Sequence, residues 1–105
     1  MTLGEKRRRF SKMLALLLHY IEFLGVDYAL DQGKRCKDCH NTHPRSTHKV
    51  GLGQDIILYA PGGIYPHPTE KQIHTSLHDF WDLLGGAKRI AADLNHYSLE
   101  HNGVR

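Results

Sequence analysis

Residues 56–63 read Ile-Ile-Leu-Tyr-Ala-Pro-Gly-Gly, a short apolar run that ends in strong turn formers. Isoleucine and tyrosine favour strands because branched and aromatic side chains pack well on a pleated surface. A run of this length, bounded by proline and glycine, suits a buried strand and is too short for a buried helix. The stretch Ile56–Tyr59 therefore predicts a central strand, with Asp55 at its start.

Two amphipathic helices are expected to pack on the sheet. From about Glu5 to Leu24 apolar residues recur at spacings of three and four, and Gly25 ends the pattern. A second such pattern runs from about Glu70 to Leu84, with Thr69 as its N-cap and Gly85 and Gly86 as its stop. The predicted apolar faces are Phe10, Met13, Leu14, Leu17, Ile21 and Leu24 on the first helix, and Ile73, Leu77, Phe80, Trp81 and Leu84 on the second.

Two further strands complete the predicted sheet. Val26–Leu30 and Leu94–Leu99 both alternate apolar and polar residues, and the second strand would carry His96. Ile64–Pro68 is expected to be a loop or hairpin return, and Asp31–Arg45 is polar with turn residues. The predicted fold class is α+β, a small antiparallel sheet flanked by helices in a single domain that spans 1–105.

Length and composition exclude several classes of protein. At 105 residues the chain can bury one core, and its 40% hydrophobic content indicates a globular rather than a disordered chain. The net charge of +3 suits any anionic partner and selects none, and Lys6–Arg9 is expected to be a solvated first helical turn rather than a nucleic-acid contact. Met13–Leu18 is too short to cross a bilayer, and no cleavage site of a signal peptide follows it. We therefore expect a cytoplasmic monomer without stable membrane insertion.

Two separated motifs carry the residue types of a hydrolytic metal site. His48 and Asp55 are seven positions apart, and the glycines between them allow a turn that lets the two side chains converge. Asp93 and His96 follow about forty residues later. Two histidines and an aspartate can supply three ligands to one Zn²⁺ and leave a position for water, with Asp93 as a candidate proton acceptor. Because strand side chains alternate, Asp93 and His96 would face opposite sides unless the chain bends at Leu94.

Both motifs match a known family. The segment 46–55, Ser-Thr-His-Lys-Val-Gly-Leu-Gly-Gln-Asp, matches the pattern Ser-x-His-x-x-Gly-x-Ala-x-Asp, with Gly53 in place of the alanine. The segment 93–97, Asp-Leu-Asn-His-Tyr, matches an acid-x-x-His-aromatic pattern. The chain thus resembles the zinc D-alanyl-D-alanine carboxypeptidases and, more closely, the phage L-alanyl-D-glutamate endopeptidases that act as endolysins. The resemblance covers the chain from about Arg9 to His101 and implies the hedgehog/DD-peptidase fold.

The resemblance also implies roles for individual residues. His48, Asp55 and His96 would be the zinc ligands, and Asp93 would be the catalytic base. The substrate would be a peptidoglycan stem peptide, cut at an L-alanyl-D-glutamate or a D-alanyl bond. A phage lysis protein of this kind would reside in the host cytoplasm before its release and then act on the cell wall. The alternative is a non-catalytic phage structural or wall-binding protein that retains the fold.

An arginine before the first motif would bind the substrate carboxylate or the developing oxyanion in this family. Arg35 is the candidate because it follows the Val26–Leu30 strand, although Cys36 departs from the usual surroundings and Arg45 remains an alternative. A guanidinium suits this role because it can pair with an oxyanion in a fork. Ser46 is a candidate substrate contact and equally a turn residue.

A second motif, Cys36-x-x-Cys39-His40, competes with this interpretation. It matches the attachment sequence of c-type haem, but haem attachment normally requires export and no axial partner stands out. The two cysteines could instead hold a structural zinc with His40 or His43, form a disulfide, or stay reduced. Reduced thiols or a local structural metal are the favoured readings.

His74 and His78 are four apart on the second predicted helix, the spacing of a His-Glu-x-x-His zinc protease. Thr75 stands where that protease needs its glutamate, so this alternative lacks a base. We expect a solvent-facing pair, although one of the two could border a substrate groove.

Overall fold

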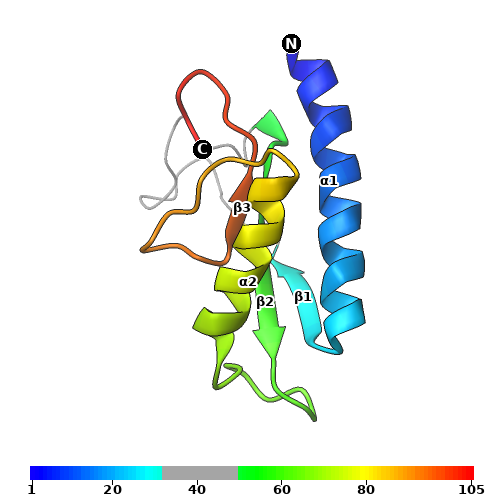
Figure 1. The fold of residues 1–105 in the computed structure, drawn as a ribbon, viewed down its shortest axis with the longest axis vertical. Coiled ribbons are helices and arrows are strands. Elements are labelled where there is room, and N and C mark those ends of the chain that lie inside the picture. Colours follow the sequence, from blue (N-terminus) through cyan, green and yellow to red (C-terminus); the bar gives the residue numbers. More distant parts are fainter. Residues whose placement is uncertain (32–49) are drawn as a thin grey trace, which may run out of the picture.

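A computed structural model describes residues 1–31 and 50–105 of the chain (Figure 1). It contains two helices and a three-stranded antiparallel sheet with the strand order β1-β2-β3, which confirms the predicted α+β class. The elements are α1 (Leu3–Leu24), β1 (Asp27–Asp31), β2 (Gly53–Tyr59), α2 (Glu70–Leu83) and β3 (His96–Ser98).

Helix α1 begins two residues before the predicted start because Thr2 and Glu5 form a capping box. The Thr2 hydroxyl accepts a hydrogen bond from the Glu5 amide, and the Glu5 carboxylate accepts one from the Thr2 amide, both at 3.1 Å. The helix ends at Gly25, whose φ of 73° is left-handed, as the sequence predicts. Its buried residues are Phe10, Met13, Leu17 and Ile21. Leu24 was expected in the same stripe but is 41% exposed.

Strand β2 is central, as predicted, and its register with both neighbours places the polar residues of the sheet. Asp55 lies opposite Asp31 on β1 and opposite His96 on β3. Residues directly opposite each other in an antiparallel sheet point to the same face. Ile56, Leu58 and Tyr97 point to the other face by the alternation of strand side chains. The sheet therefore has one apolar face and one face that carries Asp55 and His96.

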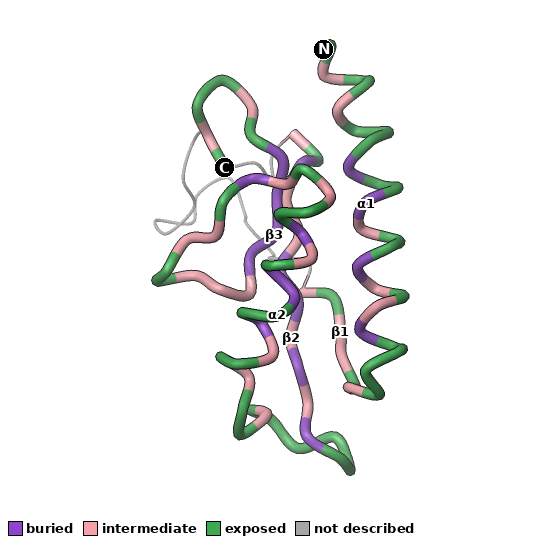
Figure 2. Tube along the Cα trace, viewed as in Figure 1, coloured by how far each residue is buried: buried purple, intermediate pink, exposed green. Residues whose placement is uncertain are grey.

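The core lies between the two helices and the apolar face of the sheet. Its buried members are Phe10, Met13, Leu17, Ile21, Leu52, Ile56, Leu58, Leu77, Trp81, Tyr97 and Leu99 (Figure 2). Phe10 and Trp81 join the helices through an edge-to-face contact with ring centroids 5.8 Å apart. The backbone of Gly86 passes so close to the Trp81 indole that a Cβ there would overlap the ring.

Helix α2 buries two histidines, so the expectation of a solvent-facing pair was wrong. His74, Leu77, His78 and Trp81 form its buried stripe. Spacings of three, one and three put these residues on one face of a helix. Polar rings are tolerated there because each histidine forms a short hydrogen bond, which is described below.

The ends of α2 agree with the predicted limits within one residue. Thr69 occupies the N-cap position, but its side chain caps no backbone amide and instead lies 3.2 Å from Nδ1 of His67. The helix stops before Gly85, which has a φ of 90°. One isolated antiparallel bridge joins Ala60, directly after β2, to Ile64, the first residue of the predicted loop Ile64–Pro68.

The basic residues of the first helical turns are largely exposed, and three of them also bind distant backbone carbonyls. Arg7 Nε donates to Val50 O at 2.7 Å, Arg9 Nη2 to Leu84 O at 3.2 Å, and Lys6 Nζ to Glu100 O at 3.3 Å. These bonds tie α1 to segments far along the chain. None of the described helices has the length and apolar character needed to span a membrane.

Candidate metal centre

A tight turn brings the second motif together. The amide of His96 donates to the carbonyl of Asp93 at 3.1 Å, and Leu94 and Asn95 form the turn between them. Strand β3 consequently begins at His96 and ends at Ser98, so the predicted strand Leu94–Leu99 was too long at both ends. This turn is the bend that Asp93 and His96 need in order to face one ion.

Asp55, Asp93 and His96 form a group that could hold a metal ion. Their ligand atoms all lie within 4.8 Å of one another, and His96 Nδ1 is 3.0 Å from Asp55 Oδ1. Asp55 and His96 are buried, whereas Asp93 is half-buried. Donor atoms bound to one tetrahedral zinc at about 2.0–2.1 Å lie roughly 3.3 Å apart, so the Asp55–His96 pair needs only a small adjustment. Two carboxylates and an imidazole fit zinc and several other divalent ions.

The other candidate site residues lie in 32–49, outside the described residues. They are the predicted ligand His48, the substrate candidates Arg35, Arg45 and Ser46, and the motif residues Cys36, Cys39 and His40. Of the four residues assigned to the metal and to the base, the structure thus brings together Asp55, Asp93 and His96.

His78 supports the turn from the core side. Its Nε2 donates to the carbonyl of Leu94 at 2.7 Å, and its ring stacks on Tyr97 with centroids 4.2 Å apart. Burial lowers the pKa of His78, so the ring is neutral at pH 7. With its proton on Nε2, the ring keeps an unprotonated Nδ1, and this atom is buried without a partner in the described part of the chain. The helix thus holds the turn between the candidate base and the candidate ligand.

His74 binds the other side of the same aromatic ring. Its Nδ1 lies 2.7 Å from the Tyr97 hydroxyl. Burial lowers the pKa of His74 to about 4 and raises that of Tyr97, so the imidazole is neutral and the phenol protonated at pH 7. Among the described residues His74 is the one acceptor at the phenol, so we assign the bond as Tyr97 O–H to Nδ1. The remaining proton of His74 is then on Nε2.

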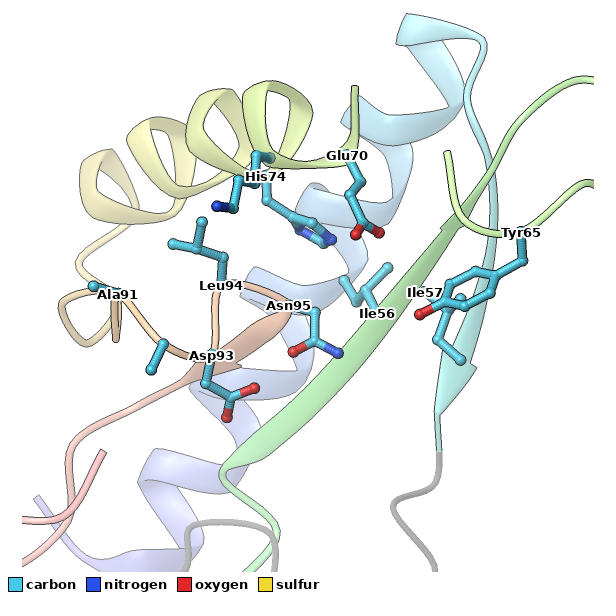
Figure 3. Close-up of a pocket in the computed structure, with 11 residues that line it drawn as sticks. Ile56, Ile57, Tyr65, Glu70, His74, Ala91, Asp93, Leu94 and Asn95 are labelled. Carbon is cyan, nitrogen blue, oxygen red and sulfur yellow. The ribbon is translucent and has the colours of Figure 1, made fainter. Parts of the chain in front are cut away.

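A cavity of about 290 Å³ adjoins the candidate base (Figure 3). Its wall combines the first turn of α2, the part of β2 that continues past β3, and the turn at 91–95. The polar lining side chains are Tyr65, Glu70, Lys71, His74, Asp93 and Asn95. Sequence reasoning missed Glu70 and Lys71. The four-residue spacing between Glu70 and His74, which places those two residues on one helix face, could have identified Glu70.

Comparisons with protein-family models, with curated proteins and with solved structures give no match to this chain. The family resemblance therefore depends on the two sequence motifs. The described residues include 50–55 of the first motif, with Asp55, and all of the second.

Proposed function

We propose that the chain is a zinc-dependent peptidase that hydrolyses peptidoglycan stem peptides at an L-alanyl-D-glutamate or a D-alanyl bond, as a phage or prophage endolysin. The observation that carries the proposal is the turn at 93–96. It brings the carboxylate of Asp93, the candidate base, close to the candidate ligands His96 and Asp55. The first and last polar residues of the second motif, Asp93 and His96, can thus face the same metal ion.

Asp55 and His96 would hold the zinc ion together with His48, which lies outside the described residues. A zinc ion there would supply Lewis acidity, which polarises a carbonyl group and makes water a stronger nucleophile near neutral pH. The donor set supports this choice because imidazole and carboxylate are common zinc ligands in catalytic sites.

Asp93 would act as general base and then as general acid. Its carboxylate accepts a proton from the attacking water and delivers it to the leaving amine, so one water is consumed for each amide bond cut. Two features support this role: Asp93 is more exposed than the two ligands, and it lines the cavity. By resemblance, Arg35 would stabilise the oxyanion and Ser46 would contact the substrate.

The same proposal implies an oligomeric state, a set of partners and a location for the protein. A lysis protein of this type would be monomeric, would bind no nucleic acid and would insert no segment stably into a membrane. It would accumulate in the host cytoplasm and reach the wall after the membrane is opened.

Mass spectrometry of fragments released from purified peptidoglycan tests the activity and identifies the bond. We expect stem-peptide fragments from the zinc-loaded protein, none after treatment with a chelator, and recovery when zinc is added back. Fragment release that survives removal of the metal would contradict the proposal. Sedimentation with the wall without any fragment release would instead support the non-catalytic wall-binding alternative.

A further inference from the structure

The cavity beside Asp93 carries two opposite charges from adjacent residues of α2. Glu70, the first residue of the helix, is half-buried, and Lys71 is exposed; both side chains line the cavity. Adjacent helical residues point about 100° apart, so the two charged groups lie on different parts of the cavity wall. Figure 3 shows the side chains of Glu70 and His74 extending from α2 toward strand β2.

Neither charge is neutralised within the described part of the chain. The ion pairs there join Arg89 to Asp79 and Asp82, and His96 to Asp55. A carboxylate and an ammonium that line one cavity without pairing with each other are complementary to a ligand that carries both charges.

His74 adds a neutral donor to the same wall. With Nδ1 occupied by the Tyr97 hydroxyl, its Nε2–H is the free polar group of a ring that lines the cavity. A neutral N–H can bind a carboxylate oxygen without adding charge to the site. The buried contact with Tyr97 fixes the orientation of the ring.

We propose that this cavity binds a zwitterionic amino-acid group of the substrate, with its ammonium at Glu70 and its carboxylate at Lys71 and at Nε2–H of His74. The inference rests on the proposed function and refines its substrate class. In a stem peptide such a group is the free end of a diamino-dicarboxylic acid residue such as meso-diaminopimelate, whereas a lysine residue offers the ammonium alone. Since the cavity adjoins Asp93, the residue recognised is close to the bond that is cut.

Isothermal titration calorimetry of the zinc-loaded full chain tests this selectivity with two ligands that contain no bond to be cut. They are meso-diaminopimelate and L-lysine, each acylated by glutaric acid at the α-amine of the L-centre. The glutaryl group replaces the γ-D-glutamyl residue and has no α-amine, so only the first ligand carries a zwitterionic amino-acid group. We expect roughly tenfold tighter binding of the first, or about 1.4 kcal/mol, as for one hydrogen bond to a charged group. Lys71→Met should abolish the difference, and Glu70→Gln should weaken the binding of both ligands.

Lys12→Met and Glu22→Gln serve as matched controls because both residues are exposed on α1. They should leave affinities and preference unchanged, and circular dichroism should show that all four variants are folded. Equal affinities in the wild type, a preference that persists in Lys71→Met, or no binding of either ligand would overturn the proposal.

The assay of fragment release separates this inference from the peptidase proposal. Chelator-sensitive release without a preference between the two ligands rejects the zwitterion site and leaves the peptidase standing. A preference without fragment release supports the site and rejects the peptidase.

Discussion

His96 Nδ1 lies 3.0 Å from Asp55 Oδ1, although the two residues are 41 positions apart in the chain. The register of β2 with β3 places them directly opposite each other, and both side chains are only 7% exposed. The pair is therefore positioned by the sheet before any ion arrives, and a metal bound to both atoms would take the place of the shared proton.

Asp55→Asn should weaken metal binding. The amide keeps the shape of the side chain but removes the negative charge, so we expect the affinity for zinc to fall by at least about tenfold. Competition with a chromophoric chelator measures this change. Asp27→Asn is the matched control because it removes a carboxylate from the far end of β1, opposite Tyr59. Unchanged affinity in Asp55→Asn would remove Asp55 from the ligand set.

Asp93→Asn should separate metal binding from catalysis. The asparagine cannot accept the proton of the attacking water, so kcat should fall by roughly 10²–10⁴ while the zinc content stays near that of the wild type. Release of wall fragments and metal analysis on the same preparation provide the two readouts. Wild-type lysis by this variant would show that Asp93 is not the base.

His78→Leu should disturb the turn that carries the site. It removes the hydrogen bond to Leu94 O, which lies between Asp93 and His96. We expect kcat to fall roughly tenfold or more with little change in KM, because the turn orients groups that act on the reacting atoms. His78→Gln retains an N–H donor and should recover part of the loss. If both variants behave alike in kcat and KM, His78 is only a core residue.

The buried His74 should make the protein less stable in acid. Its folded-state pKa of about 4 is below the usual 6.5, so the unfolded chain binds a proton that the folded chain does not between these values. Its contribution is complete above pH 6.5 and is lost as the pH falls, by about 2 kcal/mol at pH 5. Urea melts should show a smaller loss between pH 7.5 and pH 5 in His74→Gln than in the wild type.

The neighbours of His74 define this comparison. Tyr97 remains protonated throughout, and His78, whose pKa is also lowered by burial, contributes in the same direction in both proteins. Identical pH slopes for the wild type and His74→Gln would contradict the prediction.

Gly86→Ala should destabilise the fold. The new methyl group would overlap the indole of Trp81, which is fully buried and donates to Ser98 O at 2.9 Å. Overpacking of this kind costs about 1–3 kcal/mol. Gly4→Ala is the control because its methyl group would lie 3.8 Å from Arg8 Nη1 and 4.0 Å from Thr2 Oγ1, which is ordinary van der Waals contact. Denaturant unfolding should show a loss for the first variant and no loss for the second.

The sequence predicts the fold class well where one periodicity dominates. The helix α1, the central strand and the end of α2 all follow from runs of apolar residues that stop at glycine or proline. The start of α1 was placed too late because its determinant is a pair of reciprocal hydrogen bonds between Thr2 and Glu5 rather than an apolar residue. Strand β3 was overestimated because the alternation of residues 94–99 continues through a turn and beyond the paired residues.

Only part of the candidate site could be predicted from the sequence. Spacing predicts that Asp93 and His96 act together, but the turn between them depends on support from His78, which lies 16 positions from Leu94. The burial of His74 and His78 could not be read from a hydropathy pattern, because histidines count as polar until their partners, Tyr97 and Leu94 O, are known. Long-range partners of this kind become visible only in three dimensions.

The metal group joins two strands of the sheet. Asp55 belongs to β2, while Asp93 and His96 belong to one turn and the strand that follows it, so the group exists only when β2 and β3 are paired. An ion that binds this folded arrangement and not the unfolded chain would stabilise the fold by about 2.7 kcal/mol at a free concentration one hundred times its Kd. Metal supply and folding would then be thermodynamically linked, and the melting temperature of the protein would report the zinc concentration around it.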